Sequence, residues 1–439
     1  MNTSYILGTS FRWLLRLCLV GLIHGVISIN AIASGELDVT VSPSTNSVVT
    51  MDGSESFSCS PSGGCPPYTY SWSFDNASGT PPTDKKDPGD VAFGSSAEGN
   101  KNKVKVTVTD SKQASKSAET FVYVPKFEVL ELTFTTDHNL LKDNNSDWED
   151  SGTKYTEPEW KSGTNNPISQ TKNTNVGVKM KIKVTPTDTP SKSYNVVGSG
   201  PTGMNFDTSL SLAGGDNADK TATSTDKLED KIHALNDSIE WKFKLGGGES
   251  TPITTGSHKV YVTYGTPGGS SVTEKRVAYV VNKASGQATP HDALAAIHGG
   301  TYALGSATPT PIWKIAGGAP GECIHLVQFD NAAIQMLGCP AGSIMFLYPK
   351  LGKQSKESAS SSDWEIRASD NAELCFLDPH GGLNNFEAAL KYSNGGTTKW
   401  YAGGAGIYTS VQAVMNAVCD KSVWCQPNQG PIIEVAEDW

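Results

Sequence analysis

The feature of this sequence that most constrains its fold is a strict alternation of apolar and polar residues in short runs. The clearest run, "NKVKVTVTD" at residues 102–110, places valines on one side of an extended chain and lysines and threonines on the other. A strand of this kind has one buried face and one solvated face. Strand-like runs recur up to about residue 285, between stretches rich in turn residues. The pattern therefore predicts β-sandwich domains over this part of the chain.

Residues 35–125 are predicted to form the first sandwich, with further strands in "ELDVTVSP", "YTYSWSF" and "ETFVYV". The stretch "PPYTYSWSFDNASGT", followed by "KVKVTVTDSKQAS", resembles the bacterial PKD and related immunoglobulin-like extracellular modules, with Trp72 as the core aromatic residue. The turn "DNASG" is looser than the form usual in that family. The resemblance implies a spacer, or a unit that binds sugar or protein, without a catalytic cluster.

Residues 127–285 are predicted to form a second β-sandwich, from "FEVLELTFT" through "HKVYVTYG" to "KRVAYVV". Within it, "STDKLEDKIHAL" favours a short helix, and the polar tract 214–226 favours a mobile loop. The segment "DNNSDWED" at 143–150 places Asp143, Asn145 and Asp147 at alternate positions, as calcium loops often do. However, Trp148 and Lys154 stand where an EF-hand requires glycine and glutamate. A solvated acidic loop is favoured over a calcium site, and no metal site or cofactor is predicted.

Residues 287–439 change pattern and predict an α+β domain. The runs "PHDALAAIHGGTYAL" and "GECIHLVQFDNAAIQMLG" favour helices, and Gly338 provides a left-handed stop after the second. Strand-like runs follow, among them "SIMFLYP", "WEIRAS", "ELCFLD", "NNFEAALKY" and "TKWYAGG". The second helix is predicted to bury one face, made of Leu326, Phe329, Ala333, Met336 and Leu337.

The N-terminus and the charge of the chain limit its location and partners. Residues 1–33 have the pattern of a signal peptide, with Arg12 and Arg16, an apolar stretch and Ala31-Ile32-Ala33, so the mature chain is predicted to begin at Ser34. An uncleaved anchor is the alternative, but the apolar stretch is shorter than the roughly 20 residues that span a bilayer. The net charge of −10, without later basic clusters, argues against nucleic acid. We expect a secreted or cell-surface protein with no membrane span in its mature part.

An oxidising location makes disulfides the expected state of most cysteines. Of the eight cysteines, Cys18 lies in the signal segment, which leaves an odd number. Spacing favours two local disulfides, Cys59–Cys65 and Cys419–Cys425, and a third, Cys339–Cys375, if their strands are neighbours. Cys323 then has no predicted disulfide partner.

Cys323 lies where a predicted helix begins. A thiol in the first helical turn faces unsatisfied N–H groups and the positive end of the helix dipole, which both favour the thiolate, whereas Glu322 and any burial oppose it. The same N–H groups can stabilise an oxyanion when a thiolate attacks a carbonyl.

The order of elements after Cys323 adds a second resemblance. A helix that opens with Gly-x-Cys, ends in "LGCPAG" and precedes a strand resembles the core of the transglutaminase-like cysteine superfamily. That family has a histidine on a later strand and an aspartate on the next. Here Asn384 or Asn385 takes the place of the histidine, and Ala402 or Gly403 that of the aspartate. His380, in "LDPHGG", is either a substitute base or an exposed turn residue.

These observations give the following expectations. The fold is two β-sandwich (Ig/PKD-like) domains followed by a transglutaminase-like α+β domain. The favoured function is a secreted modular surface or binding protein, with an extracellular protein or polysaccharide as partner and an inactive C-terminal domain. The alternative is a thiol-dependent acyl-transfer enzyme (peptidase, amidase or transglutaminase) with candidate catalytic residues Cys323, His380 and Asn385.

Overall fold

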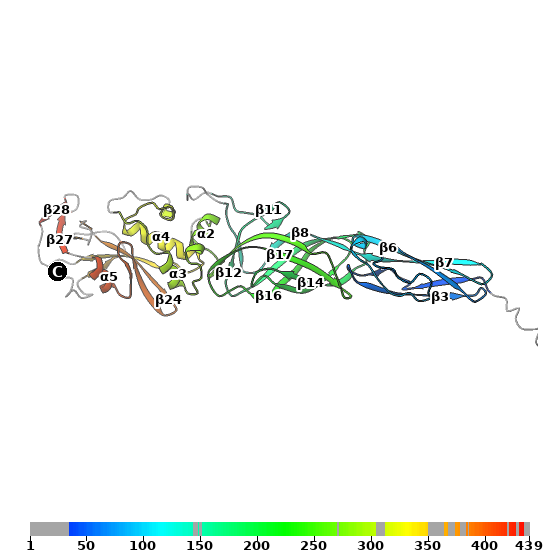
Figure 1. The fold of residues 1–439 in the computed structure, drawn as a ribbon. Coiled ribbons are helices and arrows are strands. Elements are labelled where there is room, and N and C mark those ends of the chain that lie inside the picture. Colours follow the sequence, from blue (N-terminus) through cyan, green and yellow to red (C-terminus); the bar gives the residue numbers. More distant parts are fainter. Residues whose placement is uncertain are drawn as a thin grey trace, which may run out of the picture. The chain divides into compact units, whose positions relative to one another are not determined.

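The structure of the 439-residue chain is a computed structural model (Figure 1). It describes residues 35–433 apart from 144–147, 149–151, 270–271, 304–311, 350–363, 368–373, 378–382, 385, 419–420 and 427–429. The predicted signal segment therefore lies outside the described residues. The chain divides into two compact units. The first contains the residues up to Lys126 with 188–190 and 245–249, and the second contains the remainder.

The first unit is a sandwich of two sheets. One sheet has the order β1-β3-β5 and the other β2-β7-β6-β4. The elements are β1 (Asp38–Ser42), β2 (Ser47–Val48), β3 (Ser54–Ser62), β4 (Thr69–Phe74), β5 (Gly89–Ala92), η1 (Ser95–Ala97), β6 (Asn100–Thr109) and β7 (Ser115–Val124), with β18 (Gly248–Glu249) in a later segment of the unit. As the alternation predicts, the valines of β6 are buried, and Val106 pairs with Trp72 on β4.

The strand order identifies this unit as an immunoglobulin-type sandwich. In chain order, β1 to β7 correspond to strands A, A′, B, C, E, F and G of that fold. Strand β2 runs parallel to β7, and the other neighbouring pairs are antiparallel. Trp72 lies in the core between the sheets, where its ring stacks on Phe74 at 5.7 Å. Its indole N–H donates to the carbonyl of Lys85 at 2.8 Å. The predicted core role of Trp72 is confirmed.

The predicted disulfide between Cys59 and Cys65 is not formed, because Cys59 carries a free thiol. Cys59 lies on β3 and points into the core with Phe57. Cys65 lies beyond the end of β3, where its N–H donates to Asp110 at 2.8 Å. An extended strand separates residues by about 3.3 Å each, so closeness in sequence does not bring these two side chains together.

The second unit begins with another pair of sheets. One has the order β11-β10-β8-β13-β16 and the other β15-β14-β17-β19-β12-β9, linked where Phe206 pairs with Ser224. Phe127 on the first sheet stacks on Phe243 of the second at 4.3 Å, so the two sheets share a core. The strands are β8 (Lys126–Phe134), β9 (His138–Leu140), β10 (Trp160–Lys161), β11 (Thr164–Asn165), β12 (Ile168–Thr171), β13 (Asn175–Thr185), β14 (Lys192–Ser199), β15 (Phe206–Leu212), β16 (Gly215–Lys227), β17 (His233–Leu245) and β19 (Ile253–Thr263).

Two predictions for the second sandwich are wrong. The tract 214–226 is not a loop but forms most of β16, which pairs along β13, where Lys179 and Lys181 form ion pairs with Asp219 and Asp216. Residues 224–235 do not form a helix, because they are the end of β16, the start of β17 and the short connection between them. Backbone pairing with a neighbouring strand, which composition does not reveal, decides both segments.

The run "KRVAYVV" was predicted as a strand but lies in α2 (Glu274–Lys283). Thr273 caps the helix by accepting a hydrogen bond from the N–H of Arg276. Val277, Val280 and Val281 are buried together, which is the spacing of a helical face rather than of a strand. Helix α2 packs in the same core as the helices that follow it.

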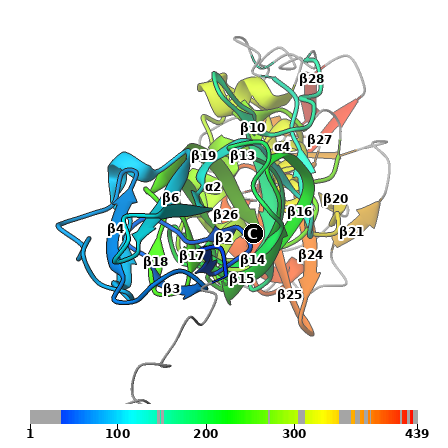
Figure 2. The same ribbon diagram turned by 90° about the vertical axis from the view of Figure 1, so that its right-hand side faces the viewer.

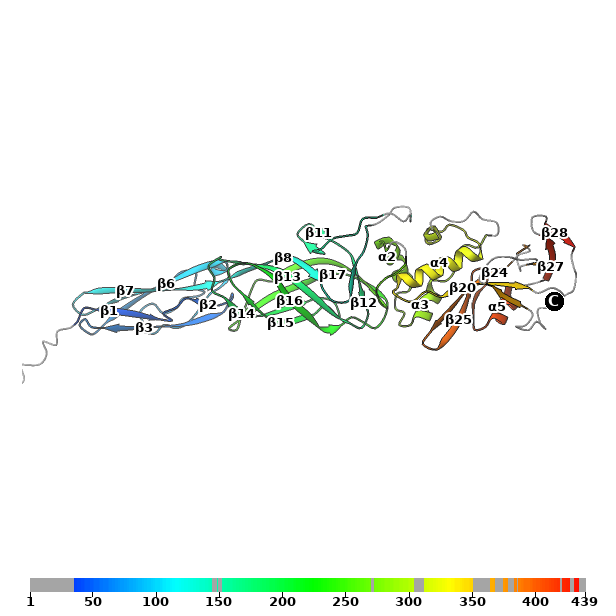
Figure 3. The ribbon, with the colours of Figure 1, turned by 180° about the vertical axis from the view of Figure 1, so that it is seen from behind.

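Helices and a sheet form the C-terminal part of the second unit. The sheet has the order β21-β20-β24-β25-β26, and Figure 2 shows its strands β24 and β25 in orange. Helix α4 packs along β24 on one face, and α5 packs on the other (Figure 3). The elements are α3 (Pro290–Ile297), η2 (Ile312–Gly317), α4 (Cys323–Met336), β20 (Ser343–Pro349), β21 (Trp364–Arg367), β24 (Glu387–Asn394), β25 (Thr397–Ala402), β26 (Gly406–Tyr408) and α5 (Val411–Val418). A further sheet contains β22 (Leu374–Leu377), β23 (Leu383–Asn384), β27 (Lys421–Gln426) and β28 (Gly430–Ile433).

The predicted helix after Gly321 is confirmed as α4. Its predicted apolar face is fully buried, and Gly338 has a φ of 78° just beyond its end. The α+β character of this part is therefore observed, with the helices against one extended sheet. No helix within the described ranges is both long and apolar enough to cross a bilayer.

Candidate functional site

The structure places Cys323 at the first position of α4, as the sequence predicts. Glu322 is the N-cap residue, and its side chain and that of His325 form a reciprocal capping box. Within it, the N–H of Glu322 donates to Nδ1 of His325 at 3.2 Å. His325 thus has a structural partner on its own helix, and the helix start is fixed by its caps.

The thiol of Cys323 is enclosed. The residue is only 4% exposed, and Sγ lies 3.9 Å from the carbonyl oxygen of Phe386. Burial raises the pKa of the Cys323 thiol well above its usual value, and the nearby carboxylate of Glu387 raises this pKa further. Backbone N–H groups act in the opposite direction but are the weaker influence. The thiol is therefore protonated at neutral pH.

The strand that faces Cys323 offers apolar side chains. Phe386, just before β24, and Ala388, Leu390 and Tyr392 on it occupy alternate positions and pack in the core that contains α4. Between them, Glu387 is buried, and its Oε1 accepts a hydrogen bond from the N–H of Gly404 at 3.0 Å. A carboxylate held in this way stabilises the turn after β25, and it disfavours a second negative charge on the thiol.

The end of β25 excludes the aspartate of the transglutaminase-like pattern. A Cβ atom at Gly403 would lie 2.1 Å from the carbonyl oxygen of Cys323 and 2.6 Å from its Cα, so no side chain fits there. Ala402 is fully buried in the core on the opposite face of the sheet, with Trp400 and Val414. Neither position can direct a carboxylate toward an imidazole beside the thiol.

The other predicted site residues are not placed. His380 and Asn385 lie outside the described residues, and of Asn384 the structure gives only its place in β23. The structure therefore brings together Cys323, Phe386, Glu387 and Gly403, of which the sequence predicted Cys323 as a site residue.

The remaining cysteine predictions have separate outcomes. Cys339 is a free, buried thiol whose pKa is raised to about 11 by burial, so the predicted Cys339–Cys375 disulfide is absent. It precedes β20 rather than lying in it. Cys419 lies outside the described residues, so the Cys419–Cys425 disulfide stays a prediction.

A buried acid–imidazole pair lies farther along α4. Nδ1 of His298 is 2.5 Å from Oδ2 of Asp330, which is completely buried. Burial raises the pKa of the Asp330 carboxyl, while the hydrogen bond from His298 acts against this rise. Asp330 follows Cys323 by two helical turns, about 10 Å, so this pair is not a catalytic partner of the thiol.

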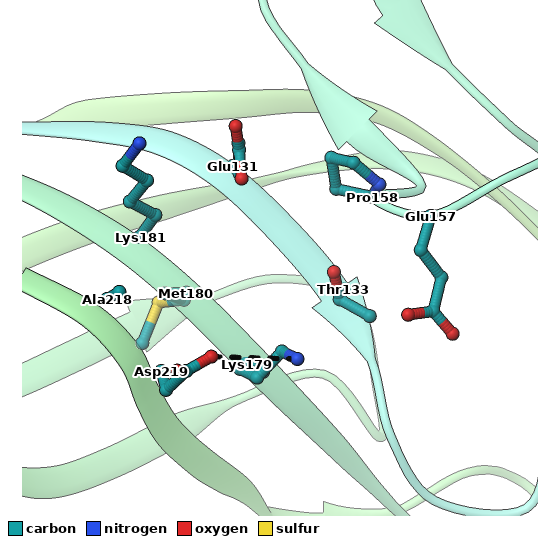
Figure 4. Close-up of a pocket in the computed structure, with 9 residues that line it drawn as sticks. All are labelled: Glu131, Thr133, Glu157, Pro158, Lys179, Met180, Lys181, Ala218 and Asp219. Atoms are coloured by element: carbon teal, nitrogen blue, oxygen red, sulfur yellow. Dashed lines mark ion pairs between the residues drawn. The ribbon is translucent and has the colours of Figure 1, made fainter.

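The second sandwich carries a polar pocket of about 220 Å³ (Figure 4). Its lining is mostly charged, and the ion pair between Lys179 and Asp219 spans 3.6 Å on one side. The lining residues come from β8, β13, β16 and the segment before β10: Glu131, Thr133, Glu157, Pro158, Lys179, Met180, Lys181, Ala218 and Asp219. A pocket of this composition suits a polar or charged ligand rather than an apolar one.

Beside this pocket, three potential metal ligands converge. The donor atoms of His138, Glu157 and Glu159 all lie within 4.8 Å of one another. Nε2 of His138 is 3.2 Å from Oε1 of Glu159, and Oε2 of Glu159 accepts from the N–H of Phe134 at 3.1 Å.

This cluster was not predicted from the sequence. Glu157 and Glu159 stand two residues apart, as on one face of a strand, which is a weak signal that many surface strands share. The histidine comes from a strand of the other sheet, so only the fold brings it there.

Neither a family model nor a curated protein matches this sequence. Among solved structures, three N-terminal domains of the outer capsid protein Hoc of bacteriophage RB49 are 11% identical, with 52% of this chain and 69% of that chain covered and a TM-score of 0.24. Fibronectin(III)-like modules of Clostridium thermocellum CbhA are 11% identical over 51% and 94%, with a TM-score of 0.19. A bacterial ice-binding adhesin is 11% identical over 86% and 98%, with a TM-score of 0.22. These scores are low, and the description of both sandwiches rests on strand order and register.

Proposed function

We propose that this chain is an exported modular binding protein whose C-terminal domain has a transglutaminase-like arrangement without a working thiol site. The observation that carries the proposal is the enclosure of Cys323, whose pKa is raised by burial, against apolar side chains of β24. Gly403 supports it independently, because the backbone of Cys323 occupies the space that an orienting aspartate would need. Acyl transfer requires a thiolate and an acid for the leaving group. The raised pKa of Cys323 disfavours the thiolate, and the sequence has asparagine where the family has its histidine.

The proposed partner is an extracellular protein or a polysaccharide. Both sandwiches have long strands whose outward side chains are polar, and the second carries the charged pocket of Figure 4. Such surfaces recognise hydroxyl-rich or charged partners through hydrogen bonds rather than by burial of apolar area. Sedimentation of the mature chain with insoluble cellulose, chitin and peptidoglycan tests the polysaccharide class. Retention by none of them would leave protein as the proposed partner class.

Thiol alkylation tests the loss of catalytic function. In the native mature chain at about pH 7.5, we expect iodoacetamide to label Cys323 far more slowly than it labels glutathione, because the raised pKa leaves almost no thiolate. Peptide mapping identifies the labelled residue. Rapid labelling of Cys323 near neutral pH that slows in His380→Ala, but not in the control His233→Ala, would overturn the proposal and support an acyl-transfer enzyme.

Export is a separate part of the proposal. The small residues Ala31 and Ala33 fit the pocket of a signal peptidase, so secreted material should begin at Ser34. Mass spectrometry of the N-terminal peptide measures this directly. Secreted protein that retains Met1 would contradict cleavage but not the loss of the thiol site.

A further inference from the structure

We propose that His138, Glu157 and Glu159 bind a divalent transition-metal cation of the Zn²⁺ type at one end of the second sandwich. This inference goes beyond the binding function proposed above and does not depend on the state of Cys323. It rests on a fixed carboxylate with an unused oxygen, on the distance of that oxygen to an imidazole nitrogen, and on a third ligand beside them.

The carboxylate of Glu159 is held in a single position. The residue is 1% exposed and directly precedes β10, where its backbone carbonyl accepts from the N–H of Asn166 at 2.7 Å. Its Oε2 accepts the N–H of Phe134, at the end of β8. The other oxygen, Oε1, is buried and has no hydrogen-bond partner among the described residues. A buried acceptor without a partner is destabilising, and more so when it is charged, so a partner for Oε1 is expected.

The imidazole of His138 directs a nitrogen toward that unused oxygen. His138 begins β9, and its strand is fixed by pairing with β12, where His138 faces Gln170. The side-chain amide of Gln170 donates to the carbonyl of Thr136 and positions the turn that leads to the histidine. Nε2 then lies 3.2 Å from Oε1 of Glu159, close enough for an ion pair but without the geometry of a hydrogen bond.

This separation is the one that two ligands of a single cation adopt. Ligands that are each about 2.1 Å from a metal and 3.2 Å from each other subtend about 100° at it, which lies between the octahedral and tetrahedral angles. The cation would give Oε1 its missing partner and would bind the imidazole through its lone pair. One ion would thus account for both the unpaired oxygen and the short distance.

Glu157 completes a three-ligand set. It is exposed, so its side chain is free to rotate, and its nearest oxygen lies within 4.8 Å of the other two donor atoms. Tetrahedral ligands at about 2.1 Å from one metal are about 3.4 Å apart, so a movement on the order of 1–2 Å brings the Glu157 oxygen into the site, and rotation of this exposed side chain provides it. Because Glu157 also lines the pocket in Figure 4, the cation would lie at the rim of that pocket.

The donor atoms select the class of metal. One imidazole and two carboxylates suit Zn²⁺ and its neighbours in the first transition row, whereas Ca²⁺ and Mg²⁺ prefer sites made of oxygen atoms only. Three protein ligands leave a position for water or for a ligand in the pocket. The cation would also connect β9 of one sheet to the segment before β10 of the other, so that binding stabilises this end of the sandwich.

Metal titration of the mature full-length chain, after treatment with EDTA, tests the proposal. We expect one equivalent of Co²⁺ to give a d–d absorption band, ZnCl₂ to displace it, and ZnCl₂ to raise the melting temperature of the wild type. Glu157→Gln, an exposed change that leaves the fold intact, should weaken Zn²⁺ binding at least about tenfold. His138→Gln and Glu159→Gln should abolish both the band and the rise in melting temperature.

Matched substitutions give the control. Glu131→Gln changes another carboxylate of the same pocket, and His233→Gln removes a histidine elsewhere in the sandwich. Both should bind Zn²⁺ as the wild type does. A wild type that binds no Zn²⁺ at micromolar concentration, or binding that persists unchanged in Glu157→Gln and His138→Gln, would show that His138 and Glu159 form only a buried ion pair.

Discussion

At the scale of single residues, burial sets the chemistry of the titratable groups in this protein. Cys323 and His258 are both hidden from water, and in each case burial favours the neutral form. His258 makes one side-chain hydrogen bond, between Nε2 and the hydroxyl of Thr255 at 3.1 Å. Its ring packs against those of Phe134 and Trp160. Cysteine and histidine are often reactive residues, but here both side chains contribute to the packing of a core.

His258 should make the second sandwich sensitive to acid. Burial lowers its pKa from 6.5 to about 4, so between these values the unfolded chain binds a proton that the folded chain does not. Stability is therefore full above about pH 6.5 and falls as the pH approaches 4, by an amount on the order of 3 kcal/mol. Urea unfolding as a function of pH measures this slope.

The substitution His258→Gln isolates the contribution of this residue. It should remove most of the loss of stability between about pH 6.5 and 4, whereas His233→Gln, at a partly exposed site, should retain it. An unchanged slope in His258→Gln would assign the acid sensitivity to other groups.

At the scale of elements, the start of α4 and the end of β25 are fitted to each other. The capping box fixes the first turn of the helix, and the chain at Gly403 passes so close to Cys323 that only glycine fits. The N–H of Gly403 donates to the carbonyl of Ala388 at 3.1 Å, which holds this approach in register. The helix start is thus a packing contact rather than an open nucleophile position.

A pair of glycine substitutions tests this contact. Gly403→Ala should destabilise the second unit by about 3 kcal/mol or more, because its Cβ would overlap backbone atoms that cannot move without shifting the helix. Gly404→Ala, whose Cβ would lie 3.4 Å from the nearest atom, should change stability by less than about 1 kcal/mol. Equal effects of the two changes in denaturant unfolding would contradict the close approach.

At the scale of the whole molecule, the chain contains separate hydrophobic cores. Trp72 is central to the core of the first unit, and Trp241 is completely buried in the sandwich of the second. Each indole N–H has a partner, the carbonyl of Lys85 for Trp72 and the hydroxyl of Thr255 for Trp241. Compact units with their own cores are expected to unfold in separate transitions.

Calorimetry of two tryptophan variants tests this expectation. Trp72→Ala should lower the melting temperature of one transition, and Trp241→Ala that of another, since removal of a buried tryptophan costs about 3–5 kcal/mol in its own core. A common shift of all transitions in both variants would show that the two units unfold as one.

The sequence by itself determined the type of those elements that bury one face against the rest of the protein. Alternation along β6 and the apolar face of α4 predicted both correctly, because burial of one face leaves a period of two or of about 3.6 in the residue order. The same approach failed for α2, where closely spaced valines fit either period, and for β16, where backbone pairing with β13 outweighs a polar composition.

Only the tertiary structure decided the chemistry of the candidate sites. The sequence predicts Cys323 at a helix start, but its enclosure depends on Phe386 and Gly403, which flank strands far along the chain. The approach of His138 to Glu159 likewise requires two sheets to meet at one end of a sandwich. Sequence patterns record which face of an element is buried. The distance between side chains on different elements depends on how those elements pack, and that distance decides whether a thiol is reactive or a cation is bound.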